Sequence, residues 1–580
     1  MIRAAMPFRV AVREPTALSV LAVLALAVGI PIGTVIWMSL RRGLPGQARP
    51  LTLENFANLA SDPFFLDTLQ NTLVFAGLTL LVTFAFLVPL TFLLARSDLP
   101  FRWGFVLLLS AAILVPTFLR AIGWIMLLSP EIGIVNRSLM NLFGLREAPF
   151  PIYSMFGMAF VQGLSFVPAG YFLLVAAYRA MDPVLEEAAY TSGLGKLRTF
   201  ARIDVPITVP AILGVLMYLF MTAISVFEAP AIIGLPARIF VMSSAIALSV
   251  QPQLGLPDYG AAGAYGMVML LFGLLFAALY LRSVRHARRY AVVTGRGYRP
   301  KTIRLGRWKP LAVAFVVFFL LLETGLPLGM IVWTSLTPFL MVPSAEALGR
   351  LTFSNYGRML AEVNPRMVVN TAILVIVAPL LAIALSVIAS WVVTRTRSRL
   401  RGAVDVLAFL PHAVPSILFA VGLSYLALLL RPVVPLYGSV LLIALAHGIA
   451  YLAFGSRALN AAMIQLHGEL EEAGRLAGLT ALGTLRRIVL PLVLPAVLSS
   501  WFWITLLSYR EVTMALVLFS RTNDVLATTI WTLWREGKSG EVAALGTFLV
   551  LVLAGVLALV AVLFRQALAA RSSLAVAAGR

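Results

Sequence analysis

The chain has 580 residues, of which 61% are hydrophobic and only 12% are charged. Soluble domains carry about twice that charged fraction, so the composition excludes a soluble globular protein and predicts a polytopic membrane protein. The formal net charge of +21 would suggest nucleic-acid binding in a soluble protein, but here the basic residues cluster between apolar runs. We therefore expect a lipid bilayer and no nucleic acid as partner.

Twelve apolar runs are long enough to cross a bilayer, which takes about 20 residues. They fall into two sets of six. The first set is expected near 16–40, 69–95, 103–128, 153–178, 206–232 and 258–282. The second set is expected near 310–337, 367–394, 402–430, 437–458, 492–519 and 541–567. No small-residue cleavage site follows the first run, so we expect an uncleaved span there rather than a signal peptide.

The two sets repeat one another in sequence. The matches are Leu51 to Phe56 with Leu351 to Tyr356, Asn71-Thr72 with Asn370-Thr371, Pro116 with Pro415, and Gly123 with Gly422. We therefore divide the chain into a first half at 1–282, a basic linker at 283–309 and a second half at 310–580. An even number of spans gives both halves the same orientation. The prediction is an all-α fold of two six-span halves in parallel repeat.

Basic residues near the span ends set the expected orientation. They are dense in the linker, which has no acidic residue, although Arg41, Arg42 and Arg49 fall on the opposite side of the membrane. The positive-inside rule then places both termini and the linker in the cytoplasm. We interpret the linker as a tether that fixes topology and touches anionic lipid head groups, with a regulatory role as the alternative.

One polar segment occurs in both halves, at a constant separation of 285 residues (Glu187 to Glu472, Gly193 to Gly478). The first copy comprises Glu187, Ala188, Ala189, Gly193, Ile203 and Pro206, and the second comprises Glu472, Ala473, Gly478, Ile488, Leu490 and Pro491. Small residues predict a slim helix that fits a groove on a partner. The glycine can end that helix in the left-handed conformation, and the proline suits the first turn of the next span. A capped helix in an ordinary loop is the alternative.

This pattern, EAA-x3-G-x9-I-x-L-P, resembles the cytoplasmic EAA loop of binding-protein-dependent ABC importer permeases. The resemblance implies a type I importer fold in the bacterial cytoplasmic (inner) membrane. It also implies that each copy forms a coupling helix, that two copies of an ABC ATPase dock on these helices, and that a periplasmic or extracellular solute-binding protein delivers the cargo. Two residues depart from the pattern. Val205 replaces a leucine, and Gly474 replaces the second alanine, which weakens that helix by up to about 1 kcal/mol.

The chain lacks a nucleotide-binding motif of its own. No G-x4-G-K-[ST] phosphate loop is present, and the fragment at 193–196 has neither the spacing nor the hydroxyl residue. We therefore expect no enzyme activity and no cofactor in this chain, with ATP and magnesium bound by the separate ATPase. An ion-coupled secondary transporter is a rival class, but it would need a proton or sodium relay that the few charges in the spans do not form. A membrane scaffold or sensor without transport is a third class.

The twelve-span layout resembles the ferric-iron branch of these permeases, including the segments SVFEAP at 225–230 and REVTMAL at 510–516. Thiamine, polyamine and phosphonate permeases have related layouts and stay open as alternatives. The sequence leaves the substrate unsettled.

Ionisable residues within spans are candidates for function. Glu228 and Glu511 occupy equivalent positions near the ends of spans 5 and 11, each three residues after a serine, Ser225 or Ser508. Together with Arg510 they form the candidate substrate path, because ferric iron prefers hard oxygen ligands. The alternative is structural, with Glu511 and Arg510 locking a helix end.

Three further polar residues fall in predicted spans. Arg120 is expected to pair internally or to extend toward the membrane surface, and Glu323 is a candidate partner. His412 lies between Pro411 and Pro415, and we interpret it as a packed polar group rather than a metal ligand. No metal site is predicted, and the prolines are expected to kink the spans.

Overall fold

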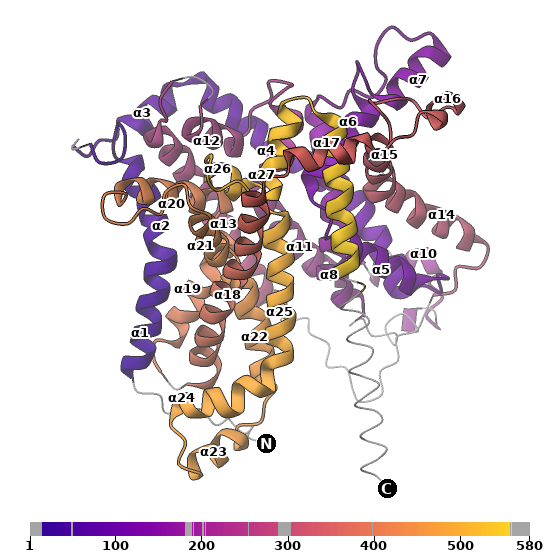
Figure 1. Ribbon diagram of the computed structural model, residues 1–580. Coiled ribbons are helices and arrows are strands. Elements are labelled where there is room, and N and C mark those ends of the chain that lie inside the picture. The colour runs from indigo at the N-terminus through magenta and orange to yellow at the C-terminus, as the bar shows by residue number, and fades with distance from the viewer. Residues whose placement is uncertain are drawn as a thin grey trace. The chain divides into compact units, whose positions relative to one another are not determined.

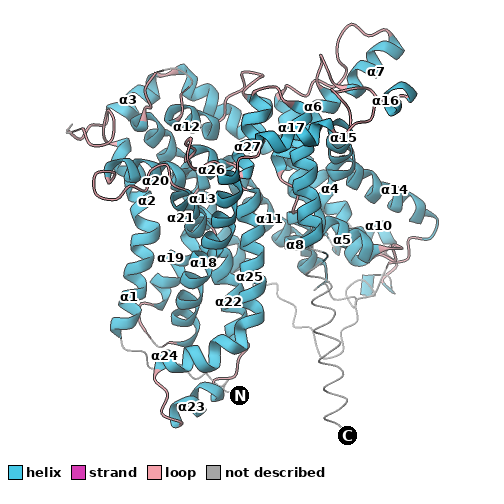
Figure 2. Ribbon diagram, viewed as in Figure 1, coloured by secondary structure: helices cyan, strands magenta, loops and turns pink. Residues whose placement is uncertain are grey.

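The structure is a computed structural model that describes residues 14–47, 50–179, 188–189, 191–199, 202–203, 205–252, 255–287, 303–396, 398–556 and 558. This described part is helical, and its only bridge between extended segments joins Ser97 to Ile303. Figure 2 shows the helices in cyan. The all-α prediction is confirmed.

The helices before the linker are α1 (Glu14–Leu24), α2 (Ile30–Ser39), α3 (Glu54–Ser61), α4 (Pro63–Arg96), α5 (Arg102–Ala112), α6 (Thr117–Leu128), α7 (Ile134–Phe143), α8 (Met155–Arg179), α10 (Lys196–Thr199), α11 (Val205–Ser225), α12 (Met242–Val250) and α13 (Tyr259–Ala287). Those after it are α14 (Lys309–Leu320), α15 (Leu326–Ser335), α16 (Ala345–Gly349), α17 (Ser354–Glu362), α18 (Pro365–Arg395), α19 (Arg401–Ala413), α20 (Ser416–Leu429), α21 (Val440–Ala450), α22 (Leu452–Ile464), α23 (Glu469–Leu476), α24 (Ala481–Thr484), α25 (Leu490–Arg510), α26 (Thr513–Val517), α27 (Leu526–Arg535) and a last helix at Ser539–Val556.

The helices account for the predicted membrane spans. Nine helices in the described part are long and apolar enough to cross a bilayer, and three bent pairs raise the number to twelve if each pair is one span. Two of these pairs, α5 with α6 and α19 with α20, bend by 98° and 99°. Pro116 and Pro415 are the residues that immediately precede α6 and α20. Proline disfavours helical backbone at the residue before it, so the two halves break the same span for the same reason.

The chain divides into two compact units, and each draws on both halves of the sequence (Figure 1). One unit contains residues 1–81, 180–298 and 364–529, and the other contains 82–179, 299–363 and 530–580. The first span (α1 and α2) therefore belongs with α18 to α26, and the seventh (α14 and α15) belongs with α5 to α8. The division at 1–282, 283–309 and 310–580 stays a prediction about the sequence repeat, and most of the linker lies outside the described residues.

A repeated glycine allows this exchange of first spans. A Cβ atom on Gly422 in α20 would collide with the backbone oxygen of Pro31 in α2, and one on Gly123 in α6 would collide with that of Pro327 in α15. Small residues let helix backbones approach closely within a membrane. Gly123 and Gly422 match in sequence because each lies where its helix crosses another closely, α6 with α15 and α20 with α2.

The repeated asparagines, Asn55 and Asn355, make equivalent hydrogen bonds in the two halves. In the second half, Asn355 Nδ2 donates to the carbonyl oxygens of Ser335 and Thr337, at 3.0 and 2.7 Å. In the first half, Asn55 Nδ2 donates to the carbonyl oxygen of Ser39 at 2.8 Å. These carbonyls lie at the ends of α15 and α2, where no partner within the helix is available.

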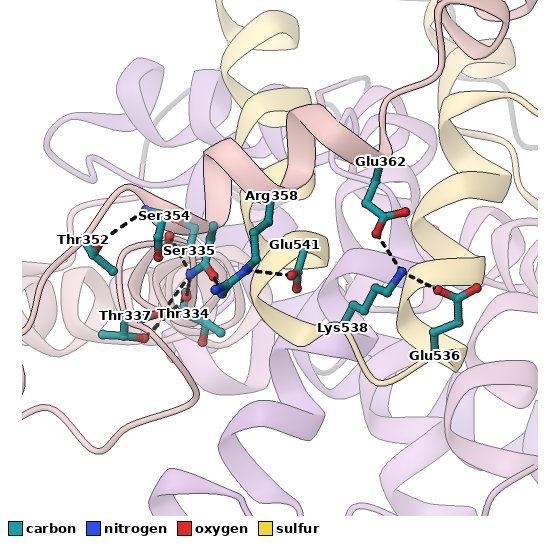
Figure 3. Close-up of polar contacts among 11 residues, drawn as sticks. Thr334, Ser335, Thr337, Thr352, Ser354, Arg358, Glu362, Glu536, Lys538 and Glu541 are labelled. Atoms are coloured by element: carbon teal, nitrogen blue, oxygen red, sulfur yellow. Dashed lines mark hydrogen bonds and ion pairs between the residues drawn. The ribbon is translucent and has the colours of Figure 1, made fainter.

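Figure 3 shows how α17 is joined to the start of the last helix. Arg358 Nε lies 2.8 Å from Glu541 Oε1, and Lys538 Nζ lies 2.7 Å from Glu362 and 2.9 Å from Glu536. Each such partly exposed ion pair contributes little stability alone. As a network they fix the direction of a short amphipathic helix.

The repeated Asn-Thr pairs at the start of α4 and α18 hold later loops. In each, the amide donates to a loop carbonyl and the hydroxyl accepts a backbone N–H. The bonds are Asn71 to Phe240 (3.1 Å), Met242 to Thr72 (2.9 Å), Asn370 to Asp524 (3.0 Å) and Leu526 to Thr371 (3.0 Å).

The described end of the linker is fastened to the end of α4. Lys309 Nζ lies 2.9 Å from Asp98 Oδ2, and the Leu305 N–H donates to Asp98 Oδ1 at 2.9 Å. The hydrogen bond from Lys309 holds the pKa of Asp98 below its ordinary value. Because the pKa is lowered in the folded chain, the ionised carboxylate contributes to folding stability at neutral pH. This stability contribution is lost only as the pH falls through the lowered pKa.

Candidate coupling helices and substrate path

The two copies of the repeated polar segment end their helices in the same way. Gly193 and Gly478 both have a φ of +82°. The Leu194 N–H donates to the Ala189 carbonyl at 3.0 Å, and the Leu479 N–H donates to the Gly474 carbonyl at 2.9 Å. A left-handed glycine with such a bond is a common helix C-terminus, so the predicted glycine conformation is confirmed in both copies.

The two prolines differ in where they lie. Pro206 is the second residue of α11, as expected for a position that needs no backbone donor. Pro491 instead lies inside a continuous helix, Ala481–Arg510, directly after the π-helical stretch Leu485–Val489, so the expectation of a first-turn proline is wrong in the second copy. Gly474, the departure from the pattern, has a packing reason. A Cβ atom there would lie 2.5 Å from Ile488 Cδ1, so an alanine would force Ile488 to move.

The second copy presents apolar side chains outward. α23 and α24 lie together at one end of their unit (Figure 1). Leu476 is 90% exposed and Leu482 is 70% exposed, and Ala473 is also exposed. Because these residues lie outside the apolar spans, we treat them as a candidate contact surface for a partner. Glu472 is half-buried beside them.

The remaining members of the two copies are placed as follows. In the first copy Ala188 is exposed, Ala189 is buried and Ile203 is half-buried, whereas Glu187 lies outside the described residues. In the second copy Leu490 is half-buried and Pro491 is exposed.

The structure adds a residue that the sequence did not single out, Glu471. Its carboxylate lies 3.2 Å from Arg395 Nε, with both side chains almost fully buried. Arg395 is the last residue of α18 and also donates to the carbonyl oxygens of Met463 and Leu466. The ion pair therefore joins α23 to the end of span 8. The sequence repeat could have pointed to Arg395, because Arg96 ends α4 at the matching position of the first half and is also buried.

The candidate path residues of the second half lie where α25 ends. Glu511 follows the helix, and its carboxylate accepts the Met514 N–H at 2.9 and 3.0 Å. His447 of α21 places Nε2 at 3.2 Å from Glu511 Oε2. Ser508, one turn earlier, is fully buried, and its hydroxyl has no hydrogen-bond partner in the described part of the chain.

Residues from both halves act on Tyr451, which lies between α21 and α22. The charged groups that influence it are Glu511, Arg510 and Glu228. Both glutamates that the sequence matched therefore exert an electrostatic influence on this one side chain. Ser225 instead donates to the Met221 carbonyl within its own helix, at 3.0 Å.

Sequence reasoning missed His447 and Tyr451. The sequence repeat could have pointed to His447, because His447-Gly448 follows Gln162-Gly163 by 285 residues, the same separation as the repeated polar segment. Gln162 is buried as well, and its Oε1 has no hydrogen-bond partner among the described residues. The two halves thus keep a buried polar side chain at the same place.

The other charged residues of the spans are explained by packing. Arg120 lies 3.0 Å from Glu323, and the two side chains are 3% and 0% exposed, so the suggested pairing is confirmed. His412 stacks on Tyr218 with ring centroids 4.9 Å apart, and it also contacts Phe409 and Phe454. This aromatic packing agrees with the interpretation of His412 as a packed polar group. Within the described ranges, no group of three or more His, Cys, Asp or Glu residues is placed to hold a metal ion.

The second half matches a known family. Residues 382–573 match the family described as "Binding-protein-dependent transport system inner membrane component". This range contains α23, the candidate path residues after α25, and the whole second copy of the repeated segment.

Two of the relatives match over most of the chain. It is 25% identical to the ferric transport system permease protein FbpB of Actinobacillus pleuropneumoniae, over 87% of this chain and 72% of that protein. It is 24% identical to the Fe(3+)-transport system permease protein FbpB 2 of Haemophilus influenzae, over 84% of this chain and 87% of that protein. The spermidine/putrescine transport system permease protein PotB of Haemophilus influenzae is 24% identical, over 41% of this chain and 81% of its own length.

Among solved structures, a bacterial alginate ABC transporter in complex with a pentasaccharide-bound periplasmic protein matches at 21% identity and a TM-score of 0.33, over 42% of this chain and 85% of that chain. That score is too low to add to the assignment, which rests on the family match, the relatives and the helical architecture. The match of residues 382–573 and the ferric relatives show a multi-pass membrane protein that is similar to binding-protein-dependent ABC importer permeases over most of its length.

Proposed function

We propose that this chain forms the whole membrane channel of an importer for ferric iron. A solute-binding protein delivers the cargo on the outer side, and two copies of an ABC ATPase dock on the cytoplasmic side. ATP and magnesium are bound by those ATPases. Closure of the ATPases moves the coupling helices and switches the access of the path, as a rigid-body transition.

The choice of ferric iron as cargo rests on how much of this chain aligns with the ferric permeases. The two ferric permeases align with 87% and 84% of this chain, so the likeness runs through both halves. The polyamine relative aligns with only 41% of it. Carboxylates at Glu228 and Glu511 suit a hard cation, which favours oxygen ligands.

Docking of the ATPases is assigned to the two copies of the repeated segment. The exposed apolar residues around α23 supply the contact area, and Glu472 supplies a carboxylate for a basic residue of the ATPase. The first copy, with Glu187, Ala188 and Ala189, plays the same part for the second ATPase. This role puts both copies, both termini and the linker in the cytoplasm.

A polyamine is the second candidate cargo. Its support is the spermidine/putrescine relative together with the two glutamates near Tyr451, since carboxylates also attract a flexible polycation. A polyamine does not need a coordinating imidazole, whereas ferric iron can be ligated by one. The two cargoes are therefore expected to depend differently on His447.

Transport in vesicles that hold the chain, its ATPase and its solute-binding protein tests this function. We expect ATP-dependent accumulation of radiolabelled ferric iron. Replacing Glu228 and Glu511 together by glutamine should lower iron uptake at least about tenfold while ATPase binding is kept, because each lost charge next to a cation is worth about 1 kcal/mol or more. Accumulation of spermidine in place of iron would overturn the cargo assignment.

A further inference from the structure

α21 holds an imidazole, next to Glu511 at the end of α25, whose hydrogen-bonding capacity is unused. His447 is 0% exposed, yet its Nδ1 has no hydrogen-bond partner within the residues that the structure describes. Its only close ionic neighbour there is Glu511, at 3.2 Å from Nε2. A buried polar atom without a partner is costly, so such atoms call for a role or for a bound species.

Glu511 is held in a fixed position beside this imidazole. The Met514 N–H binds both carboxylate oxygens, which orients the group. A carboxylate has about four lone-pair positions, so one N–H leaves acceptor capacity toward His447 and toward a ligand. The Glu511 side chain is 12% exposed, so the pair is not sealed off.

The separation of the two groups fits two neighbouring ligands of one cation. Ligands about 2.1 Å from a metal ion and at right angles to each other are about 3 Å apart. His447 Nε2 and Glu511 Oε2 are 3.2 Å apart.

Tyr451 and Ser508 carry further oxygen donors in this part of the unit. Tyr451 is one helical turn after His447, with ring centroids 5.8 Å apart, and its hydroxyl makes only a long 3.4 Å bond to the Leu507 carbonyl. The Ser508 hydroxyl is buried and has no hydrogen-bond partner in the described segments. Carboxylate, imidazole and phenol donors together suit iron better than they suit a neutral cargo.

We propose that His447 and Glu511, with Tyr451 beside them, form a binding site for the cargo cation in the second half of the chain. The proposal rests on the proposed import of ferric iron and assigns one step of it to named atoms. Glu511 supplies the negative charge, and His447 binds the cation through Nε2.

The first half cannot form the same site, because Gln162 stands at the position equivalent to His447. An amide is a weak metal ligand compared with an imidazole. The site is therefore asymmetric, with one cation per chain. His447→Gln changes the second half to the residue that the first half already accommodates, which makes it a conservative test.

Binding to the full chain in nanodiscs tests the site without transport. Ferric nitrilotriacetate is the probe, and the readout is the amount of iron retained per chain. We expect one bound ion for the wild type, and an affinity lower by at least about tenfold for His447→Gln and for Glu511→Gln. The matched control is His467→Gln, at an exposed histidine, which should bind like the wild type.

Two results would overturn the site. One is wild-type affinity in a folded His447→Gln variant, with folding checked by thermal unfolding, and the other is no iron binding by the wild type. Uptake by the reconstituted importer separates these from failure of the proposed function. If iron is imported normally by His447→Gln, the site assignment fails and the cargo assignment stands. If the wild-type importer moves no iron, the cargo assignment fails as well.

Discussion

Glutamine in place of Glu471 should leave the chain in the membrane and bound to its ATPase but should lower ATP-driven uptake at least about tenfold. Breaking a buried ion pair typically costs about 3–5 kcal/mol. Here Arg395 still donates hydrogen bonds to the carbonyl oxygens of Met463 and Leu466 in the variant. We therefore expect a loss of interaction free energy near the low end of that range. The loss falls on the link between α23 and α18, which in the proposed function transmits the ATPase movement into the membrane.

The neighbouring residue provides the control for this prediction. Glu472 is half-buried on the same helix and is assigned to the ATPase contact, so Glu472→Gln should weaken co-purification of the ATPase. Glu471→Gln should instead keep co-purification and raise the number of ATP molecules hydrolysed per cargo molecule. Normal uptake by Glu471→Gln would show that the Arg395 pair is only structural.

Leucine in place of Glu323 should produce the largest loss of stability. Arg120 would remain buried at 3% exposure without its counter-ion, at a cost of about 3–5 kcal/mol. We expect a clearly lower midpoint of thermal unfolding in detergent and a lower yield of inserted protein. Fluorescence-detected gel filtration after heating measures both.

The repeat supplies a natural control for this pair. Phe419 stands at the position of Arg120, by the offset that matches Gly123 with Gly422, and Ala27 stands four residues before Pro31 as Glu323 stands four before Pro327. The equivalent pair is therefore apolar. Since apolar replacement of a buried pair is often neutral, Arg120→Phe with Glu323→Ala should recover most of the stability. A double variant as unstable as Glu323→Leu would mean that the pair has a role beyond mutual neutralisation.

Local features of this chain could be predicted from sequence. The spans follow from hydropathy over about 20 residues. The left-handed conformations of Gly193 and Gly478, and the place of Pro206 at the start of α11, follow from the backbone preferences of those two residue types. The pairing of Arg120 with Glu323 could be suggested because a charge within a span needs a partner.

Features that depend on contacts between distant segments could not be predicted. The exchange of first spans follows from close helix crossings at Gly123 and Gly422, and a repeat within one chain does not say which half each span packs on. Glu471 and Glu472 are adjacent in sequence, and only the position of Arg395 shows which of them is buried. His447 gains its importance from Glu511, which lies 64 residues later in the sequence.

The central claim is that the surface around α23 meets an ATPase, and site-specific cross-linking tests it most directly. The chain has no cysteine, so a benzophenone probe attached to Leu476→Cys reports on one position alone. The control is Leu142→Cys in α7, which is also exposed, at 76% against 90%. We predict an adduct with the ATPase from position 476 and none from position 142. An ATPase adduct at position 142, or none at position 476 while the importer still transports, would contradict the account.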